Sequence, residues 1–241
     1  MTTPAIHNYL LALADDEHFM GQQHTEWIGV APFLEEDMAF ASIGQDELGH
    51  AALLYALIVN DESAVDDLAF HRLPGEYRSC QLVEANLTDW ADTLIRHWLY
   101  DQAEELRWSV LAGSSWTELA NIAARAQREE AYHLRHAEAL LDSLLQTTKG
   151  SERLDAALKR VMPLTAGLFA APQGEEEALA AGVASDSFAN LFPQWQQKIS
   201  ERFPQVEWPE DTAQRTDRHP DFAALHNRIR SVLALDLTAV W

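Results

Sequence analysis

In its first quarter the chain reads Gly44-Gln45-Asp46-Glu47-Leu48-Gly49-His50. Glu47 and His50 are three residues apart, so both side chains project from one face if this stretch is a helix. A second pair with the same spacing, Glu130 and His133, occurs further along the chain. Inward-facing Glu-x-x-His pairs on two helices, with one carboxylate from each of two other helices, form di-iron or di-manganese sites in four-helix bundles. The sequence therefore predicts such a site if two further carboxylates lie at the same depth.

Composition favours an all-α protein. The 241 residues are 47% hydrophobic, with only ten glycines and nine prolines, and no alternating run of β-branched residues predicts a strand. A chain of this length fits one domain. We expect a single domain over residues 1–241, with a four-helix core in residues 1–147 and a helical extension in residues 148–241.

Charge and cysteine content exclude several classes of function. The net charge of -21 argues against nucleic acid or an anionic membrane as partner, since both need clustered Lys and Arg. The single cysteine, Cys80, excludes an internal disulfide and fits a reducing compartment. The first residues lack the features of a signal peptide, and no apolar run reaches the length of a membrane span. We expect a soluble, cytoplasmic protein.

Helical periodicity and turn signals place the elements. Long helices are expected at about residues 4–28, 33–59, 89–112, 116–146 and 152–169. Short helices are expected near residues 175–182, 187–202 and 221–235. Pro32 and Gly113-Ser114-Ser115 mark the turns of two helical hairpins. Residues 60–87 are expected to form a long crossover between the hairpins, with a short helix around residues 64–70.

The two hairpins carry carboxylates at matching depth. Residues at one level of an antiparallel hairpin are equally far from its turn. Glu17 and Glu47 are centred on Pro32, and Asp101 and Glu130 are centred on the second turn, so each pair lies about 22 Å from its turn. Four carboxylates and two imidazoles suit two iron or manganese ions. The predicted metal ligands are Glu17, Glu47, His50, Asp101, Glu130 and His133.

Other residues compete for this role or have simpler explanations. Either Glu-x-x-His pair alone is better explained as an ion pair on a helix surface, but four buried carboxylates would be costly without a cation. Glu104 and Glu105 compete with Asp101, which fits the depth better. Glu26 lies too near the first turn and is expected to be structural. Surface or satisfied core positions are expected for His18, His24, His97 and His136.

At these positions the chain resembles the ferritin-like A and C subunits of the multicomponent phenylacetyl-CoA ring 1,2-epoxidase, the phenylacetic acid catabolic proteins. The resemblance is clearest at Gln22–Trp27, Ile43–His50, Ala91–Asp101 and Glu130–Arg135. The length, the early first helix and the final Trp241 resemble the C subunit, in that family a structural partner without an intact metal site. The order Glu, Glu-x-x-His, Asp, Glu-x-x-His resembles the catalytic A subunit.

The resemblance implies a ferritin-like four-helix bundle with a long crossover and additional C-terminal helices. It also implies an O2-dependent monooxygenase that epoxidises the ring of phenylacetyl-CoA in phenylacetate degradation, with two iron ions (or manganese) as cofactor. A sister ferritin-like subunit or a second copy would be the partner. A separate reductase would donate electrons, because the chain has no glycine-rich fingerprint for flavin or nicotinamide and too few cysteines for an iron–sulfur cluster.

Three alternatives remain open at the level of sequence. One is a non-catalytic scaffold for the catalytic sister subunit, with or without a residual metal site. A ferroxidase-type iron protein is less favoured, because ferritins lack an extension of this length. A radical-generating reductase subunit is also less favoured, because its tyrosine follows the first histidine by four residues, where this chain has Leu54 and then Tyr55.

Overall fold

The computed structural model describes residues 3–59, 64–209 and 213–236. Trp241, which carries part of the resemblance, and the first residues of the expected crossover lie outside these ranges. The described residues form helices and no strands, which confirms the all-α fold class.

The long helices are α1 (Pro4–Thr25), α2 (Leu34–Val59), α4 (Trp90–Ala112), α5 (Thr117–Leu145), α6 (Thr148–Val161) and α8 (Phe188–Arg202). The short ones are η2 (Asp67–His71), η3 (Pro74–Glu76), α3 (Gln81–Glu84), η4 (Met162–Gly167), α7 (Glu175–Ala180), α9 (Phe222–Ile229) and η5 (Leu233–Leu235).

The helix ends differ from the predicted ones for local reasons. The fifth long helix, α6, begins earlier than predicted, because the Thr147 side chain accepts a hydrogen bond from the backbone N–H of Gly150. It ends as an α-helix at Val161 and continues as a 3₁₀ turn that contains Pro163. The four-residue helix α3 was not predicted, since a single turn leaves no periodic pattern. The expected last helix is divided into α9 and η5.

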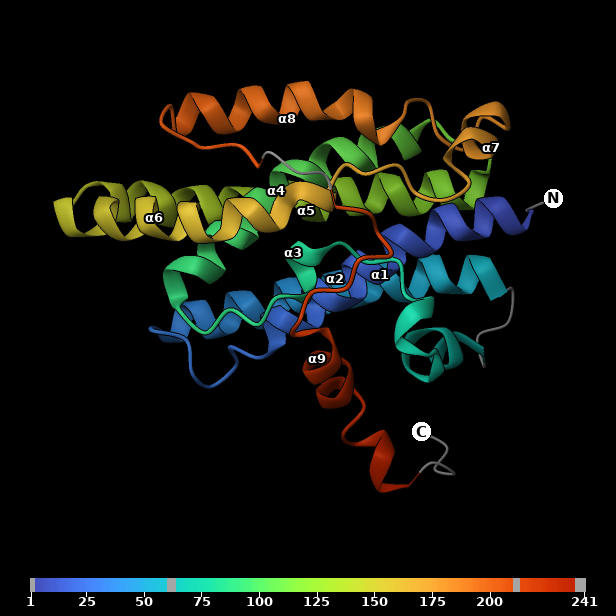
Figure 1. Cartoon of the computed structure of the whole chain (residues 1–241), viewed down its shortest axis with the longest axis horizontal. Coiled ribbons are helices and arrows are strands. Elements are labelled where there is room, and N and C mark those ends of the chain that lie inside the picture. Colours follow the sequence, from blue (N-terminus) through green and yellow to red (C-terminus); the bar gives the residue numbers. More distant parts are fainter. Residues whose placement is uncertain (1–2, 60–63, 210–212, 237–241) are drawn as a thin grey trace.

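Two antiparallel hairpins, α1–α2 and α4–α5, form the four-helix bundle (Figure 1). Residues 64–89 run back along the bundle from the end of α2 to the start of α4, so the expected crossover is observed. Helix α8 packs along α4, and α9 projects from the opposite side. Helix α4 has the most enclosed position, since residues 91–104 are all buried.

Helices α1 and α2 approach closely because glycines lie at their crossing. A Cβ atom at Gly44 would lie 3.0 Å from the Thr25 Cγ2 and 3.1 Å from the Gly21 carbonyl oxygen. One at Gly21 would lie 2.8 Å from the Leu48 Cγ. Gly44 opens the stretch that holds Glu47, so this close contact fixes Glu47 against α1.

The segment after α8 is anchored in the bundle by buried ion pairs. Arg215 donates to Asp16 of α1 at 2.8 Å, and Arg218 pairs with Glu84 of α3 at 2.6 Å. Both carboxylates are fully buried. The part of the extension that carries Arg215 and Arg218 therefore packs directly against α1 and α3. Among the described residues, no helix combines the length and apolar character that a membrane span requires.

Candidate metal centre

All six predicted ligands lie in the interior of the bundle. Each is at most 2% exposed to solvent. Glu17 comes from α1, Glu47 and His50 from α2, Asp101 from α4, and Glu130 and His133 from α5. Side chains from four helices therefore share the core, where an unpaired carboxylate is costly.

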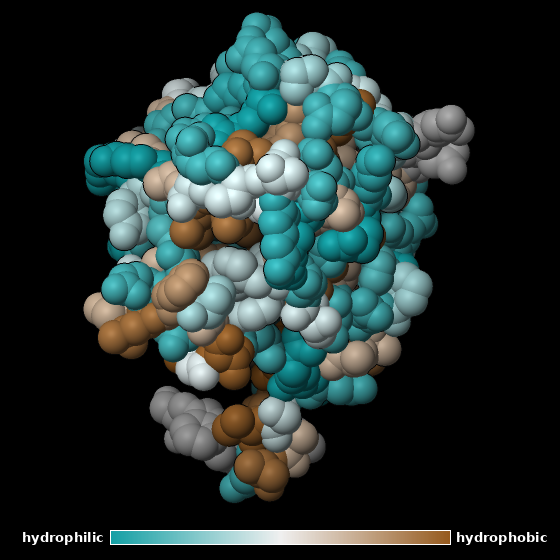
Figure 2. Space-filling view, turned by 90° about the vertical axis from the view of Figure 1, so that its left-hand side faces the viewer, coloured by the Kyte–Doolittle hydropathy of each residue, from teal (hydrophilic) through white to brown (hydrophobic). Residues whose placement is uncertain are grey.

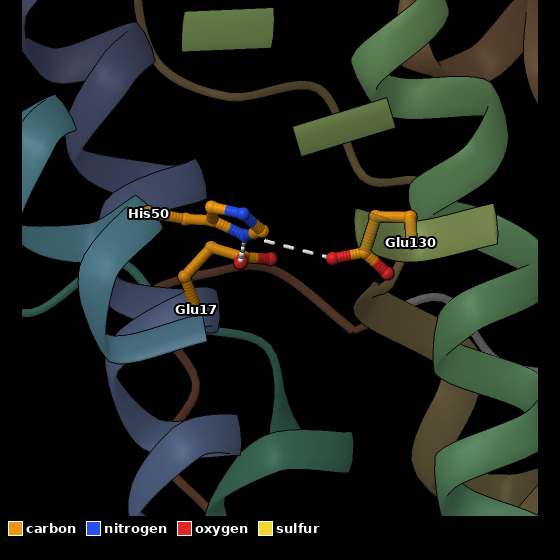
Figure 3. A group of neighbouring side chains, drawn as sticks. All are labelled: Glu17, His50 and Glu130. Carbon is orange, nitrogen blue, oxygen red and sulfur yellow. Dashed lines mark hydrogen bonds and ion pairs between the residues drawn. The ribbon is translucent and has the colours of Figure 1, made fainter. Parts of the chain in front are cut away.

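Three of the six residues already stand at ligand spacing. The Glu17 Oε2 lies 2.8 Å and the Glu130 Oε1 3.5 Å from the His50 Nδ1. One ligand atom from each of these residues lies within 4.8 Å of the others, and the three side chains converge from α1, α2 and α5 (Figure 3). His133 joins this group through its Nδ1, which is 3.4 Å from the Glu130 Oε2.

Glu47 and Asp101 border this group rather than contacting it directly. The Glu47 Oε2 lies 2.6 Å from the His24 Nδ1, and the Asp101 Oδ2 lies 3.1 Å from the His97 Nδ1. Their charges nevertheless act on the group, since burial and then the charge of Glu17 raise the pKa of Glu47 well above its usual range. The structure thus unites Glu17, His50, Glu130 and His133 and leaves Glu47 and Asp101 beside them.

Glu105 is excluded as a ligand on α4. Its side chain is half exposed and pairs with Lys198 on α8. Glu104, in contrast, is fully buried, pairs with Arg107, and shares a hydrogen bond with Glu17. The carboxylate that competes with Asp101 is therefore Glu104, because it faces α1 while Glu105 faces the surface.

Many buried polar atoms in the carboxylate layer, which the six predicted ligands and Glu104 form, make no well-aligned hydrogen bond among the described residues, even where a neighbour lies within ion-pair distance. A buried oxygen without a partner costs about 1–3 kcal/mol, and more when it is charged. Divalent cations would satisfy carboxylate oxygens and imidazole nitrogens together, so the donor set fits iron or manganese. The atoms are Glu47 Oε1, both oxygens of Asp101 and of Glu130, Glu104 Oε2 and His133 Nδ1.

The shifted pKa values of Glu17, Glu130 and His133 reflect the negative charge buried in the carboxylate layer. Burial, and then the charge of Glu130, raise the pKa of Glu17 to about 8. For Glu130, burial acts to raise the pKa, but the neighbouring His133 outweighs it and the pKa is lowered. Burial likewise acts to lower the pKa of His133, but Glu130 and Asp46 raise it to about 12. Protons thus neutralise charge that bound cations would neutralise instead.

Two partly exposed carboxylates hold the imidazoles from the α2–α5 face. The Glu129 Oε2 on α5 lies 2.8 Å from the His50 Nε2 on α2, and the Asp46 Oδ2 on α2 lies 3.3 Å from the His133 Nε2 on α5. Carboxylates in this position orient metal-binding imidazoles. Neither carboxylate was predicted from the sequence, although each directly precedes the glutamate of a Glu-x-x-His pair.

The expectation that His24 and His97 are surface or satisfied core residues holds for His97 but not for His24. Both are fully buried. The His97 Nδ1 lies 3.1 Å from Asp101, four residues later on the same helix, and the His97 Nε2 lies 3.4 Å from the His136 Nδ1. The His24 Nε2 has no hydrogen-bond partner among the described residues. The contact of His24 with Glu47 was not predicted because the two residues are distant in sequence. Glu26 is structural as expected, since it pairs with Arg228 at 2.6 Å.

Comparison with known proteins agrees with the resemblance noted in the sequence. A family model described as "Phenylacetic acid catabolic protein" matches residues 1–241. The chain is 34% identical over 194 residues to the C subunit of 1,2-phenylacetyl-CoA epoxidase from Escherichia coli (strain K12). This match covers 79% of the chain and 78% of that relative. The chain therefore belongs to the phenylacetic acid catabolic protein family.

Proposed function

We propose that this chain is a metal-holding subunit of an oxygenase complex that epoxidises the ring of phenylacetyl-CoA in phenylacetate degradation. The relative in Escherichia coli bears the name of an epoxidase subunit, which supports a place in a multi-subunit enzyme. The observation that carries the metal proposal is the set of orphaned carboxylate oxygens in one buried layer. Such a layer is favourable only when cations or protons neutralise it.

Some side chains of the carboxylate layer would bind the metal ions, and neighbouring carboxylates would orient the metal-binding imidazoles. Glu17, His50 and Glu130 would hold the metal ions, with His133, Glu47 and Asp101 completing the set. Glu129 and Asp46 would fix the orientation of the two imidazoles. Two iron ions, or manganese, would supply the activation of O2 that no side chain can supply.

Aromatic side chains around the carboxylate layer would exclude water and hold Glu17 in place. The Tyr100 hydroxyl donates to the Glu17 Oε1 at 2.8 Å, and the Trp108 ring packs 5.4 Å from the His50 ring, measured between centroids. Both aromatic residues are buried. A dry site strengthens every charge interaction inside it.

The remaining components would come from other proteins. A separate reductase would supply electrons, and a partner protein would help this acidic chain to bind the phosphates of CoA. A sister bundle subunit is the proposed partner, in the cytoplasm.

A second candidate is a scaffold role, favoured by an exposed apolar surface at the α1–α2 turn. Figure 2 looks onto the end of the bundle that carries this turn, and hydrophobic side chains gather in its lower half. An apolar cluster of this kind marks a contact with another protein. The turn surface consists of Ile28, Val30, Phe33, Leu34 and Met38, each more than half exposed.

Metal analysis separates the two candidates. We expect protein loaded with Fe(II) under anaerobic conditions to retain about two ions per chain. Glu130→Gln should lose most of this metal, whereas Glu118→Gln, an exposed control on the same helix, should keep it. Retention near zero in the wild-type chain would reject the metal proposal and leave the scaffold.

The scaffold role has its own test. Phe33→Asp should weaken co-purification with the sister subunit, and Leu73→Asp, an equally exposed apolar residue elsewhere, should not. Unchanged co-purification of Phe33→Asp would exclude the turn surface as the contact. In the assembled complex, Glu130→Gln should abolish epoxidation without loss of assembly if this chain carries the chemistry.

A further inference from the structure

Three histidines form a separate cluster beside the carboxylate layer. His24 of α1, His97 of α4 and His136 of α5 have ring centroids 4.9 Å apart (His24–His97) and 5.6 Å apart (His97–His136). Phe40 packs against all three rings. His24 and His97 are fully buried, and the His136 side chain is 15% exposed. The cluster therefore reaches from the core almost to the surface.

Each ring meets a carboxylate on one side only. The His24 Nδ1 lies 2.6 Å from Glu47, and the His97 Nδ1 lies 3.1 Å from Asp101. The His136 Nε2 lies 3.1 Å from the Glu36 Oε2. In a neutral imidazole the nitrogen beside a carboxylate carries the proton, and the other nitrogen keeps a lone pair. Carboxylates arranged in this way fix the tautomers of metal-binding histidines.

The remaining nitrogens face one another. The His97 Nε2 lies 3.4 Å from the His136 Nδ1, and with the tautomers just described both are acceptors. The buried His24 Nε2 has no hydrogen-bond partner among the described residues. Burial, and then the charge of His97, lower the pKa of His136 to about 4, so its lone pair is free at neutral pH.

The separation of 3.4 Å between the two facing nitrogens also matches a shared metal ion. Two imidazole nitrogens on one tetrahedral Zn(II), each at about 2.05 Å, lie about 3.3 Å apart. The outer nitrogens of the three rings meet the carboxyl groups of Glu36, Glu47 and Asp101, which hold the rings in place around the facing nitrogens.

We propose that His97 and His136 bind a single late transition-metal ion such as Zn(II), at a site distinct from the carboxylate layer. Water would complete the coordination through the partly exposed side of His136. Imidazole donors suit zinc, copper or nickel, whereas the carboxylate-rich layer suits harder ions. The ion would cross-link α4 to α5. The proposal does not depend on epoxidation, because it concerns nitrogen donors outside the predicted ligand set.

Zinc binding to metal-free protein tests the site. In a titration of EDTA-treated protein with Zn(II) alone, against a chromophoric chelator, we expect a binding event that survives Glu130→Gln. His136→Phe, and the milder His136→Gln, should weaken this event at least tenfold. His71→Phe, which removes an exposed histidine from the crossover, should leave it unchanged. Circular dichroism would verify that each variant is folded.

Three outcomes would overturn the proposal. They are the absence of Zn(II) binding in the wild-type chain, equal affinity in the wild type and His136→Phe, and loss of all Zn(II) binding in Glu130→Gln alone. The last outcome would assign zinc to the carboxylate layer. Failure of Fe(II) to bind while the His136-dependent zinc event persists would reject the proposed function and keep this site, so the two proposals fail separately.

Discussion

His50 on α2 and Glu129 on α5 are joined across the bundle, with 2.8 Å between the His50 Nε2 and the Glu129 Oε2. The reciprocal pair, His133 on α5 and Asp46 on α2, is 3.3 Å apart. In both pairs the residue directly before one Glu-x-x-His glutamate meets the histidine of the other motif. This exchange orients both imidazoles and connects α2 to α5.

Removal of Glu129 should weaken metal binding without unfolding the chain. Loss of a carboxylate behind a metal-binding imidazole typically lowers affinity about 10–100-fold. We expect Glu129→Ala to show a loss of this size for Co(II), measured by its absorption bands, since the Glu129 side chain is 24% exposed and contributes little to the core. Glu118→Ala, an exposed change on α5, provides the control. Equal Co(II) affinity in both variants would show that Glu129 does not orient a ligand.

The two glycines of the opening stretch should respond in opposite ways to alanine. Gly44→Ala places a Cβ 3.0 Å from the Thr25 Cγ2, so α1 and α2 must separate, at a cost of about 1–3 kcal/mol in unfolding free energy. A Cβ at Gly49 meets no described atom within 4 Å, so Gly49→Ala should stabilise the helix by about 0.5–1 kcal/mol. Urea unfolding measures both changes. A stable Gly44→Ala would refute close packing at this crossing.

The metal-free protein should lose stability as the pH rises from about 7 to about 8. Folded Glu17 has a pKa of about 8 against an ordinary value of 4.5, and His133 one of about 12 against 6.5. Both groups therefore bind more protons in the folded than in the unfolded state over this range, so unfolding releases protons and is favoured by higher pH. His18 and His136, whose pKa values are lowered to about 4, are mostly neutral in both states.

Urea titrations in EDTA at intervals across this range measure the slope. Glu17→Gln should give a shallower slope, because it removes one of the groups that bind more protons in the folded than in the unfolded state. Stability that increases with pH in the wild-type chain would contradict the assigned directions.

The buried pair between Arg215 and Asp16 should matter far more than an exposed pair. Arg215→Met leaves Asp16, which is 0% exposed, with Arg107 as its remaining cation. Breaking a buried pair costs about 3–5 kcal/mol. Arg153→Met breaks the ion pair with Asp89, in which the Arg153 side chain is 56% exposed and the Asp89 side chain 41% exposed. This change should lower the unfolding free energy by less than about 1 kcal/mol. Similar thermal midpoints for the two variants would show that the C-terminal segment is not held by Arg215.

Much of the bundle was predictable because its signals are local. Helical periodicity located the long helices, and turn residues such as Pro32 fixed which helices form hairpins. Equal distance from the turns then selected Glu17 and Asp101 among many acidic residues. The single-turn helix α3 could not be predicted because one turn leaves no periodic pattern, and neither glycine nor proline marks the break between α9 and η5.

Residue number alone predicts which carboxylates and histidines lie at one level, because the rise per residue of a helix converts residue number into depth. Which neighbours those side chains meet around the bundle depends on how the four helices pack. The tertiary structure placed Glu104 rather than Glu105 beside Glu17, brought Glu129 to His50, and grouped His24, His97 and His136. Rotation and spacing of packed helices set these contacts, and both depend on close approaches such as that of Gly21 and Gly44.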